Sequence, residues 1–441
     1  MGDLLFWHRL QFGFTATFHY LFPQLTMGLA LVILLLKGLG LAKGDERFDT
    51  AARFWIRIFG LSFAVGVVTG IPLEFQFGTN WARFSTHAGG VIGQTLGMEG
   101  MFAFFLESTC LGLLVWGERK LGRKRHFLAA LALFLGSWAS GYFIVATNAF
   151  MQHPVGYLTA ADGSLQLADF WAYLLNPWAI VQYLHTMMGA SVTGAFAVAA
   201  VGAFWTLRDE HVVQAALFLK TGVCVGLVAS CLVAFPTGDQ QGKRVARHQQ
   251  PTLAAMEGRW RSGPYAELNL IGQPNVEGRR LDNPVRLPGL LSFIAYGSFS
   301  SSVKGLDEFP RDQWPTNLEF LYYGFHIMVG LGTLFIALMG LSALMLPGGR
   351  LLRHRPLLWA LMLAFPFPFI ANSAGWVVAE FGRQPWLVYG LMRTVDGTSQ
   401  LVHPGQTVFT CLGFAGLYFV LGLLFLFLVG REVNHGPVAQ A

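Results

Sequence analysis

Residues 97–113 read GMEGMFAFFLESTCLGL, an apolar run that carries Glu99 and Glu107 and contains no Lys or Arg. Such a run suits a membrane-spanning helix, in which an unpaired acid is costly. The whole chain has the same character, since 54% of its 441 residues are hydrophobic and 12% are charged, against about 25% in soluble domains. The composition predicts a membrane protein with several spans.

Further apolar runs of similar length recur along the chain. A transmembrane helix needs about 20 predominantly apolar residues, and nine runs qualify: 14–36, 54–77, 94–116, 127–149, 179–206, 216–236, 318–346, 357–380 and 405–430. We therefore expect an all-α polytopic membrane protein with nine transmembrane helices in helical bundles. Its expected parts are helices one to six in 1–236, an extracytoplasmic loop over 237–317, and helices seven to nine with a cytoplasmic tail in 318–441.

The basic residues predict the orientation of the chain. The runs ERKLGRKR at 118–125 and RLLRHR at 350–355 lie in loops that follow the third and seventh spans. Cytoplasmic loops are enriched in Lys and Arg, so we expect the N-terminus outside and the C-terminus in the cytoplasm. The net charge of +6 then follows from topology, and no nucleic-acid partner is expected.

Few ionisable side chains fall inside or at the edges of the expected spans, and they are histidines and glutamates. They are His19, His185, His326, Glu74, Glu99, Glu107, Glu319 and Glu380. Such groups are costly at this depth and usually mark a cofactor, an ion path or a buried pair. With no Lys or Arg placed inside the expected spans, we expect a cofactor or a proton path.

The expected depth of these groups sharpens the prediction. With this topology, one set lies within about ten residues of the outer helix ends at a rise of about 1.5 Å per residue: His19, Glu74, Glu99, His185, Met328 and Glu380. Imidazole, thioether and carboxylate groups can all ligate haem iron. The outer layer therefore suits redox chemistry at a metal.

Glu107 stands apart from this layer. It lies eight residues beyond Glu99, which on a regular helix is about 12 Å further toward the cytoplasm and about 80° round the helix. We expect Glu107 to relay protons from the cytoplasm toward the outer layer.

Several blocks of the sequence resemble one protein family. They are GIPLEFQFGTNW (70–81), GMEGMFAFFLES (97–108), GSWASGYFIVATNAFMQHPVG (136–156), QYLHTMMGASVTGAF (182–196), IMVGLG (327–332) and GWVVAEFGRQPW (375–386). They are similar to the signature blocks of subunit I of cytochrome bd-type quinol oxidases, and the resemblance covers nearly the whole chain. It implies a low-spin haem b, a high-spin haem b, and a second high-spin haem that is usually haem d, with haem b as the alternative in its place.

The resemblance also implies roles for individual residues. His185 and Met328 would be the axial pair of the low-spin haem, and His19 and Glu380 would each ligate one high-spin haem. Glu99 would sit on the distal side of the oxygen-reactive haem. The remaining implied residues are Glu107, Ser108 and Ser140 in the proton path, Trp376 between haems for electron transfer or simply for packing, Arg383 and His326 at the haems, and Glu257, Gln249 and Thr252 at the quinol.

Two positions depart from the family pattern. His326 stands where the family commonly has Arg, two residues before Met328. It could compete with Met328 as a ligand, although a two-residue offset turns it about 200° away on a helix. Thr252 stands where a Lys thought to contact quinol is usual, and we expect Lys to be tolerated there. Glu257 is retained, and the short loop resembles that of the cyanide-insensitive branch.

The implied function is a terminal oxidase of the bacterial cytoplasmic (inner) membrane, which oxidises quinol outside and reduces O2 to water with cytoplasmic protons. Its implied partners are a homologous subunit II and, in many members, a one-helix accessory subunit; the quinol would be ubiquinol or menaquinol. Two other interpretations stay open. One is a haem oxidase of the same fold with a different electron donor, and the other is a proton-coupled secondary transporter, which should show repeated halves.

Overall fold

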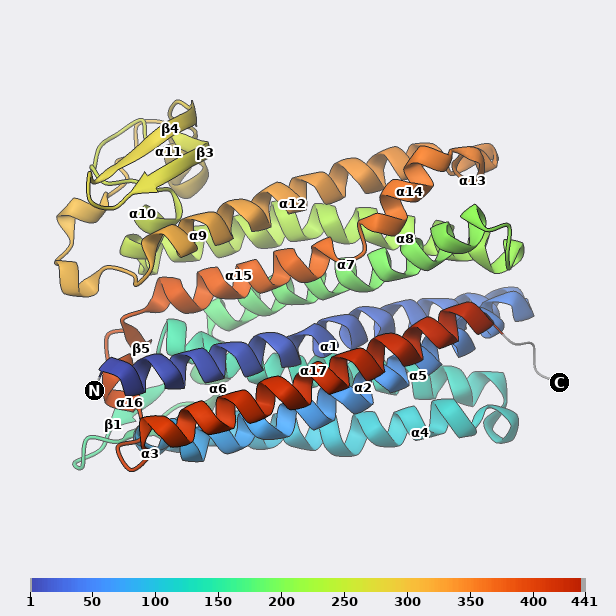
Figure 1. The fold of residues 1–441 in the computed structure, drawn as a ribbon, viewed down its shortest axis with the longest axis horizontal. Helices are drawn as coiled ribbons and strands as arrows, with labels where there is room; N and C mark the ends of the chain where they lie inside the picture. The colour runs from blue at the N-terminus through green and yellow to red at the C-terminus, as the bar shows by residue number, and fades with distance from the viewer. Residues whose placement is uncertain (1, 438–441) are drawn as a thin grey trace.

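The structure, a computed structural model, describes residues 2–437. Figure 1 shows long helices lying side by side along one axis, with the two termini at opposite ends of the bundle. Within the described residues, nine helical segments are long and apolar enough to cross a membrane: Leu4–Lys43, Glu46–Thr79, Ala82–Trp116, Glu118–Gln152, Phe170–Leu207, Val212–His248, Leu318–Leu344, Arg355–Arg383 and Pro404–His435. The expected fold class and number of spans are confirmed.

Several spans are built from more than one helical element. In chain order the elements are α1 (Gly2–Lys43), α2 (Glu46–Thr79), α3 (Ala82–Gly100), η1 (Met101–Glu107), α4 (Ser108–Trp116), α5 (Glu118–Gln152), α6 (Phe170–Leu174), α7 (Pro177–Leu207), α8 (Val212–Leu232), η2 (Val233–Gly238), α9 (Asp239–His248), α12 (Leu318–Leu344), α14 (Arg355–Leu363), α15 (Phe367–Arg383) and α17 (Pro404–His435). The elements η1 and η2 are π-helical. π-Helical turns occur mostly at functional sites.

Local sequence explains where individual helices begin and how closely they pack. The Asn176 side chain accepts a hydrogen bond from the backbone N–H of Trp178 at 2.9 Å, and Pro177 occupies the first turn of α7, which is a favourable start for a helix. At the centre, a Cβ on Gly28 of α1 would lie 2.1 Å from the carbonyl oxygen of Ala190. Only glycine permits this approach of α1 to α7, the kind of contact that holds helices together in lipid.

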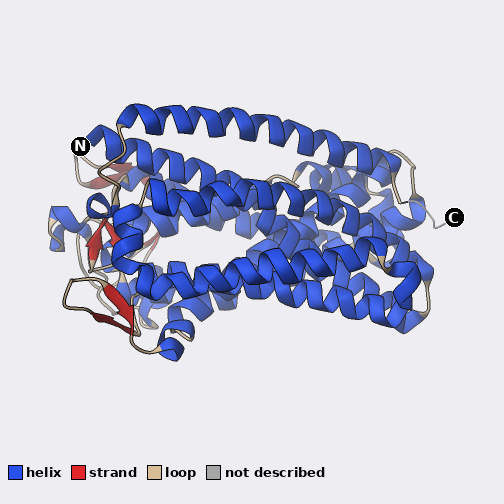
Figure 2. Ribbon diagram, turned by 90° about the horizontal axis from the view of Figure 1, so that it is seen from below, coloured by secondary structure: helices blue, strands red, loops and turns tan. Residues whose placement is uncertain are grey.

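The short elements gather mainly at one end of the bundle, where Figure 2 shows all the strands. They are β1 (Tyr157–Thr159), β2 (Leu165–Leu167), α10 (Gln250–Met256), β3 (Leu268–Asn275), β4 (Arg280–Leu287), α11 (Leu290–Tyr296), η3 (Leu306–Glu308), η4 (Arg311–Gln313), β5 (Trp386–Val388), β6 (Met392–Arg393) and α16 (Thr394–Gly397), with η5 (Pro347–Gly349) and α13 (Arg350–Arg353) at the other end. The strands form antiparallel pairs, of which β3 with β4 is the longest. The largest such region lies between α9 and α12.

The polar region between the sixth and seventh spans begins while the chain is still helical. The helix continues without a break through η2 and α9 to His248. The α9 sequence DQQGKRVARH is polar. The apolar run of the sixth span therefore ends before α9, whereas the helix continues through it. The first ten residues of this polar region, Asp239–His248, are therefore helical, and the bounds 237–317 expected for the loop stay a prediction.

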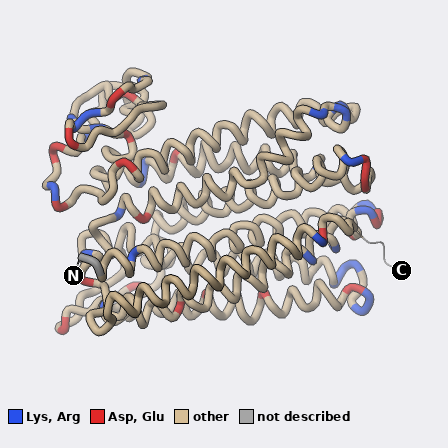
Figure 3. Tube along the Cα trace, in the orientation of Figure 1, with Lys and Arg blue, Asp and Glu red and all other residues tan. Residues whose placement is uncertain are grey.

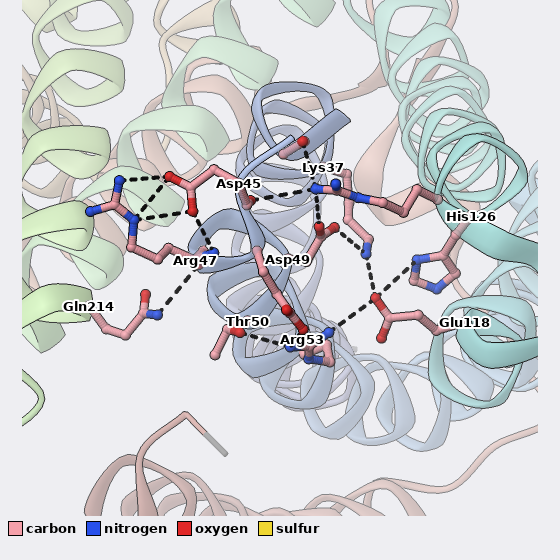
Figure 4. A network of polar contacts seen from close by, with 12 residues as sticks. Lys37, Asp45, Arg47, Asp49, Thr50, Arg53, Glu118, His126 and Gln214 are labelled. Atoms are coloured by element: carbon pink, nitrogen blue, oxygen red, sulfur yellow. Dashed lines mark hydrogen bonds and ion pairs between the residues drawn. The ribbon is translucent and has the colours of Figure 1, made fainter. Parts of the chain in front are cut away.

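Basic side chains crowd the short loops at the end of the bundle opposite the N-terminus (Figure 3). One basic residue there is buried: Lys37 is 3% exposed, and its Nζ lies 2.9 Å from Asp49 Oδ1 and 2.7 Å from Glu118 Oε1. Arg53 joins this network through Glu118 at 3.4 Å (Figure 4), and Arg123 pairs with Asp49 at 2.6 Å. Lys37 lies just past the expected span 14–36, because α1 continues beyond its apolar run and carries this buried, paired cation with it.

Candidate functional site

His19 of α1 is held by a threonine of α2. Its Nδ1 lies 3.1 Å from Thr69 Oγ1, and the Thr69 hydroxyl itself donates to the carbonyl oxygen of Val65 at 2.9 Å. A hydroxyl has one hydrogen, so toward His19 it acts as the acceptor and Nδ1 carries the ring proton. The lone pair of Nε2 is then free to ligate a metal, which is the arrangement that metal-binding histidines usually have.

His185 of α7 repeats this arrangement in the π-helical element η2. Its Nδ1 lies 3.3 Å from Thr237 Oγ1, and Thr237 donates to the carbonyl oxygen of Leu232 at 2.9 Å. The same argument places the proton on Nδ1 and frees Nε2. The bond to Leu232 spans five residues, which is the spacing of the hydrogen bonds in a π-helix. The π-helical turn of η2 therefore positions this hydroxyl beside His185.

A glycine lies against each of the three side chains expected to ligate iron through nitrogen or sulfur. A Cβ would lie 3.0 Å from His19 Cε1 at Gly70, 3.4 Å from His185 Cε1 at Gly238, and 2.8 Å from Met328 Sδ at Gly375. Gly70 and Gly238 directly follow Thr69 and Thr237. The chain thus supplies free donor atoms, fixed tautomers and room around the rings, and these residues fit haem ligands.

His326 faces away from Met328, toward the loop that contains β3. Its Nδ1 lies 2.8 Å from the carbonyl oxygen of Tyr322 and its Nε2 lies 2.8 Å from that of Asn269, while its ring stacks on Tyr322. Met328 contacts Gly375 of α15 instead. Because both ring nitrogens of His326 are engaged with backbone, the structure offers no donor atom of His326 for a metal.

Glu380, near the end of α15, is held by two neighbours. Asn148 Nδ2 donates to Glu380 Oε1 at 2.6 Å, Arg383 donates to the other carboxylate oxygen, and Gln182 donates to Asn148 Oδ1 at 2.8 Å. Arg383 is 2% exposed. The assumption that no basic residue could pair with these acids therefore fails for Glu380, and the hydrogen bonds orient its carboxylate as is usual for a metal ligand.

Trp376 lies one turn before Glu380 and next to the residue that follows His19. The rings of Tyr20 and Trp376 meet edge to face with centroids 5.8 Å apart. An aromatic side chain therefore lies between the helix that carries His19 and the helix that carries Glu380.

The two glutamates of the opening segment face two serines of α5. Glu99 lies beside Ser140 and near Glu74, whereas Glu107 lies beside Ser137. The π-helical element η1 joins the two acids, and its wider turns rotate less per residue than an α-helix, so the acids come nearer to one face than the expected 80°. Glu107 is 5% exposed and Ser140 is 5% exposed.

Ser108 does not join this pair in the structure. Its hydroxyl donates to the carbonyl oxygen of Phe104 in the same helix. Ser137, which the sequence reasoning missed, takes the place beside Glu107. Its position three residues before Ser140 was the available signal, because that spacing puts both hydroxyls on one helix face.

In the loop between the sixth and seventh spans, Glu257 is 2% exposed. Burial raises the pKa of Glu257 to about 8, against smaller lowering effects of the Asn269 backbone N–H and Arg259. The Asn269 side chain also donates to the carbonyl oxygen of Glu257 at 2.6 Å. The structure thus buries the Glu257 side chain and bonds its backbone to Asn269 of β3.

Gln249 and Thr252 are used for docking the loop onto the bundle. Gln249 Nε2 donates to Gln152 Oε1 at 2.8 Å, and the Thr252 hydroxyl donates to the carbonyl oxygen of Gly382 at 2.7 Å. Thr252 is 3% exposed, and a Cβ on Gly382 would lie 2.4 Å from Thr252 Cγ2. This packing leaves no room for a longer side chain, so we now expect Lys at this position to disturb the contact.

Comparison with known proteins places the chain among relatives of matching length. The family model described as cytochrome bd terminal oxidase subunit I matches residues 7–437. Cytochrome bd ubiquinol oxidase subunit 1 of Bacillus subtilis (strain 168) is 37% identical over 438 residues, which cover 97% of this chain and 93% of that protein. Cytochrome bd-II ubiquinol oxidase subunit 1 of Escherichia coli (strain K12) is 30% identical, covering 100% of this chain and 98% of that one.

A solved structure agrees with these sequence relatives. A chain of the bd oxidase from Geobacillus thermodenitrificans has a TM-score of 0.90 with this chain at 29% identity, with 99% of each chain covered. The match extends over all the helices that carry the residues described above. By the family model and the curated relatives, this chain belongs to the cytochrome bd terminal oxidase subunit I family.

Proposed function

We propose that this chain is the haem-carrying subunit of a quinol-oxidising terminal respiratory oxidase in the bacterial cytoplasmic membrane. The observation that carries the proposal is the paired Thr–His arrangement, in which Thr69 and Thr237 fix the tautomers of His19 and His185. The family membership supports the reaction: two quinols supply four electrons to one O2. The test of this proposal is steady-state oxygen consumption by the assembled complex. It compares ubiquinol or menaquinol analogues with an artificial one-electron donor.

The proposed cofactors are three haems. His185 and Met328 would hold the low-spin haem b, and His19 and Glu380 would serve the high-spin haem b and a haem d or a further haem b. When bound, these groups supply electron transfer and oxygen reduction. The residues of the chain orient the ligands, and Trp376 with Tyr20 fills the space between two ligand helices.

The proposed orientation puts the N-terminus and the external loop outside. The basic loops at the opposite end support this orientation. A homologous subunit II is the proposed partner, with a one-helix accessory subunit as a further one. Protons would then enter from the end rich in basic residues and reach Glu99 through Glu107.

Glu107→Gln should slow oxygen consumption about tenfold or more while leaving haem content unchanged. Glutamine keeps the size and hydrogen bonding of the side chain but cannot carry a titrating proton, and loss of a positioned proton-transfer group costs about 10²–10⁴-fold when that step limits the rate. The assay is turnover together with the haem spectrum. Thr109→Ser, at an exposed position two residues further along the same span, is the control. Unchanged turnover in Glu107→Gln would remove the relay assignment.

Quinol oxidation should rise as the outer pH rises through about 8, the raised pKa of Glu257. Below that pH the buried carboxyl keeps its proton, and above it the carboxylate can accept a proton from the quinol. Glu257→Gln should lower quinol-driven turnover strongly and abolish this pH dependence, while turnover with the one-electron donor persists. A variant with normal quinol turnover would show that Glu257 is not the acceptor.

A further inference from the structure

Several polar atoms of the external loop and α12 are buried without a hydrogen-bond partner, and three of them belong to residues that lie close together. These three atoms are Glu257 Oε2, Tyr322 Oη and Asn269 Oδ1. Tyr322 is 1% exposed and Glu257 is 2% exposed. Buried polar groups are nearly always hydrogen-bonded, so unpartnered ones that lie together indicate a missing ligand or water.

Packing brings the first two groups together and fixes them. A Cβ on Gly258, which has φ +59°, would lie 3.1 Å from Tyr322 Cε2, so the tyrosine ring lies against the residue that follows Glu257. His326 stacks on the same ring with centroids 3.9 Å apart and bonds to the backbone of Asn269. Tyr322 therefore cannot turn away from Glu257 without breaking the contact between α12 and β3.

We propose that Tyr322 is a second quinol-binding residue, whose hydroxyl donates a hydrogen bond to the quinol oxygen that gives its proton to Glu257. This inference rests on the proposed function. A quinol hydroxyl has one hydrogen to donate and lone pairs to accept, so a single hydroxyl satisfies both groups: it donates to Glu257 Oε2 and accepts from Tyr322. Tyr322 keeps its bond after oxidation, because a quinone carbonyl still accepts.

Neighbouring residues suit an apolar ligand that arrives from the membrane. Leu270 and Ile271 follow Asn269 on β3 and are exposed, as is Ile327 on α12. Thr252 cannot take the role of Tyr322, since its hydroxyl hydrogen is given to Gly382. The phenol of Tyr322 thus supplies the donor that the family usually provides with a lysine side chain.

The test compares Tyr322→Phe with Tyr323→Phe in the assembled complex. Phenylalanine removes only the hydroxyl, and the neighbouring Tyr323 is exposed on the same helix. For Tyr322→Phe we expect the KM for ubiquinol-1 to rise about tenfold, as for loss of one hydrogen bond, with turnover on a one-electron donor unchanged. Tyr323→Phe should behave as the wild type.

Thermal unfolding gives a readout apart from activity. Because the Tyr322 hydroxyl has no partner in the protein, Tyr322→Phe should not lower the Tm without quinone. Added ubiquinone-1 should raise the Tm of the wild type and of Tyr323→Phe, by mass action, and raise that of Tyr322→Phe much less. A purely structural tyrosine would instead lower the Tm without quinone.

Two outcomes separate this inference from the proposed function. If Tyr322→Phe keeps the wild-type KM and the wild-type Tm shift while Glu257→Gln is impaired, the inference is overturned and the proposed function stands. If no quinol supports oxygen consumption by the wild type while a one-electron donor does, the proposed function fails and the inference fails with it.

Discussion

His185→Ala and Met328→Leu should each remove the low-spin haem spectrum and stop quinol-driven oxygen consumption. Alanine removes the Nε2 donor that the Thr237 contact leaves free, and leucine removes the sulfur that lies over Gly375. His185 and Met328 would hold the low-spin haem, so either variant would lack one of the two donor groups proposed for it. Reduced-minus-oxidised optical spectra and haem content per protein measure the outcome.

Two further variants test the assignment of His185 and Met328 as the ligands. Thr237→Val keeps the shape of the side chain but removes the acceptor for Nδ1–H, and loss of such a supporting contact typically costs about 10–100-fold in affinity or activity. His326→Ala should keep the low-spin spectrum, because both of its ring nitrogens are bonded to backbone carbonyls. A normal spectrum in Met328→Leu combined with its loss in His326→Ala would reverse the assignment.

The apolar runs predicted the spans well because burial in lipid demands about 20 apolar residues whatever the tertiary structure. They could not show where helices continue in polar sequence. Lys37 and α9 both lie in such extensions, and each is stabilised by contacts from elsewhere, as in the bond from Lys37 to Glu118. Those contacts have no local sequence signature.

Some residues of the candidate site could likewise be predicted from the sequence, and others could not. Ionisable side chains in apolar surroundings pointed to His19, Glu99 and Glu107 because their cost is visible in the sequence itself. The residues that orient them, such as Thr69 and Ser137, are neutral and common in membrane helices, so they carried no signal alone. Tyr322 was missed for another reason: its relation to Glu257 depends on a loop folding back onto α12, which is a long-range contact.

His19→Ala and Glu380→Gln should abolish oxygen reduction while leaving the low-spin haem in place. The two residues lie on α1 and α15, with Tyr20 and Trp376 between them, whereas the His185 contacts come from η2. Damage to one centre should therefore spare the other. The measurement is oxygen consumption with the one-electron donor, together with the high-spin and low-spin bands.

Glutamine is the sharper substitution at 380 because it separates ligation from folding. Removing the whole side chain would leave Arg383, 2% exposed, without its carboxylate partner, although it would still donate to the backbone carbonyls of Trp386 and Leu387. Glutamine keeps an oxygen that can accept from Asn148 or Arg383 but offers no anionic donor to iron. Thr69→Val should give an intermediate loss through His19, about 10–100-fold. If Glu380→Gln retained full oxygen consumption and normal high-spin bands, the carboxylate would serve only to pair with Arg383 and to join α15 to α5 through Asn148.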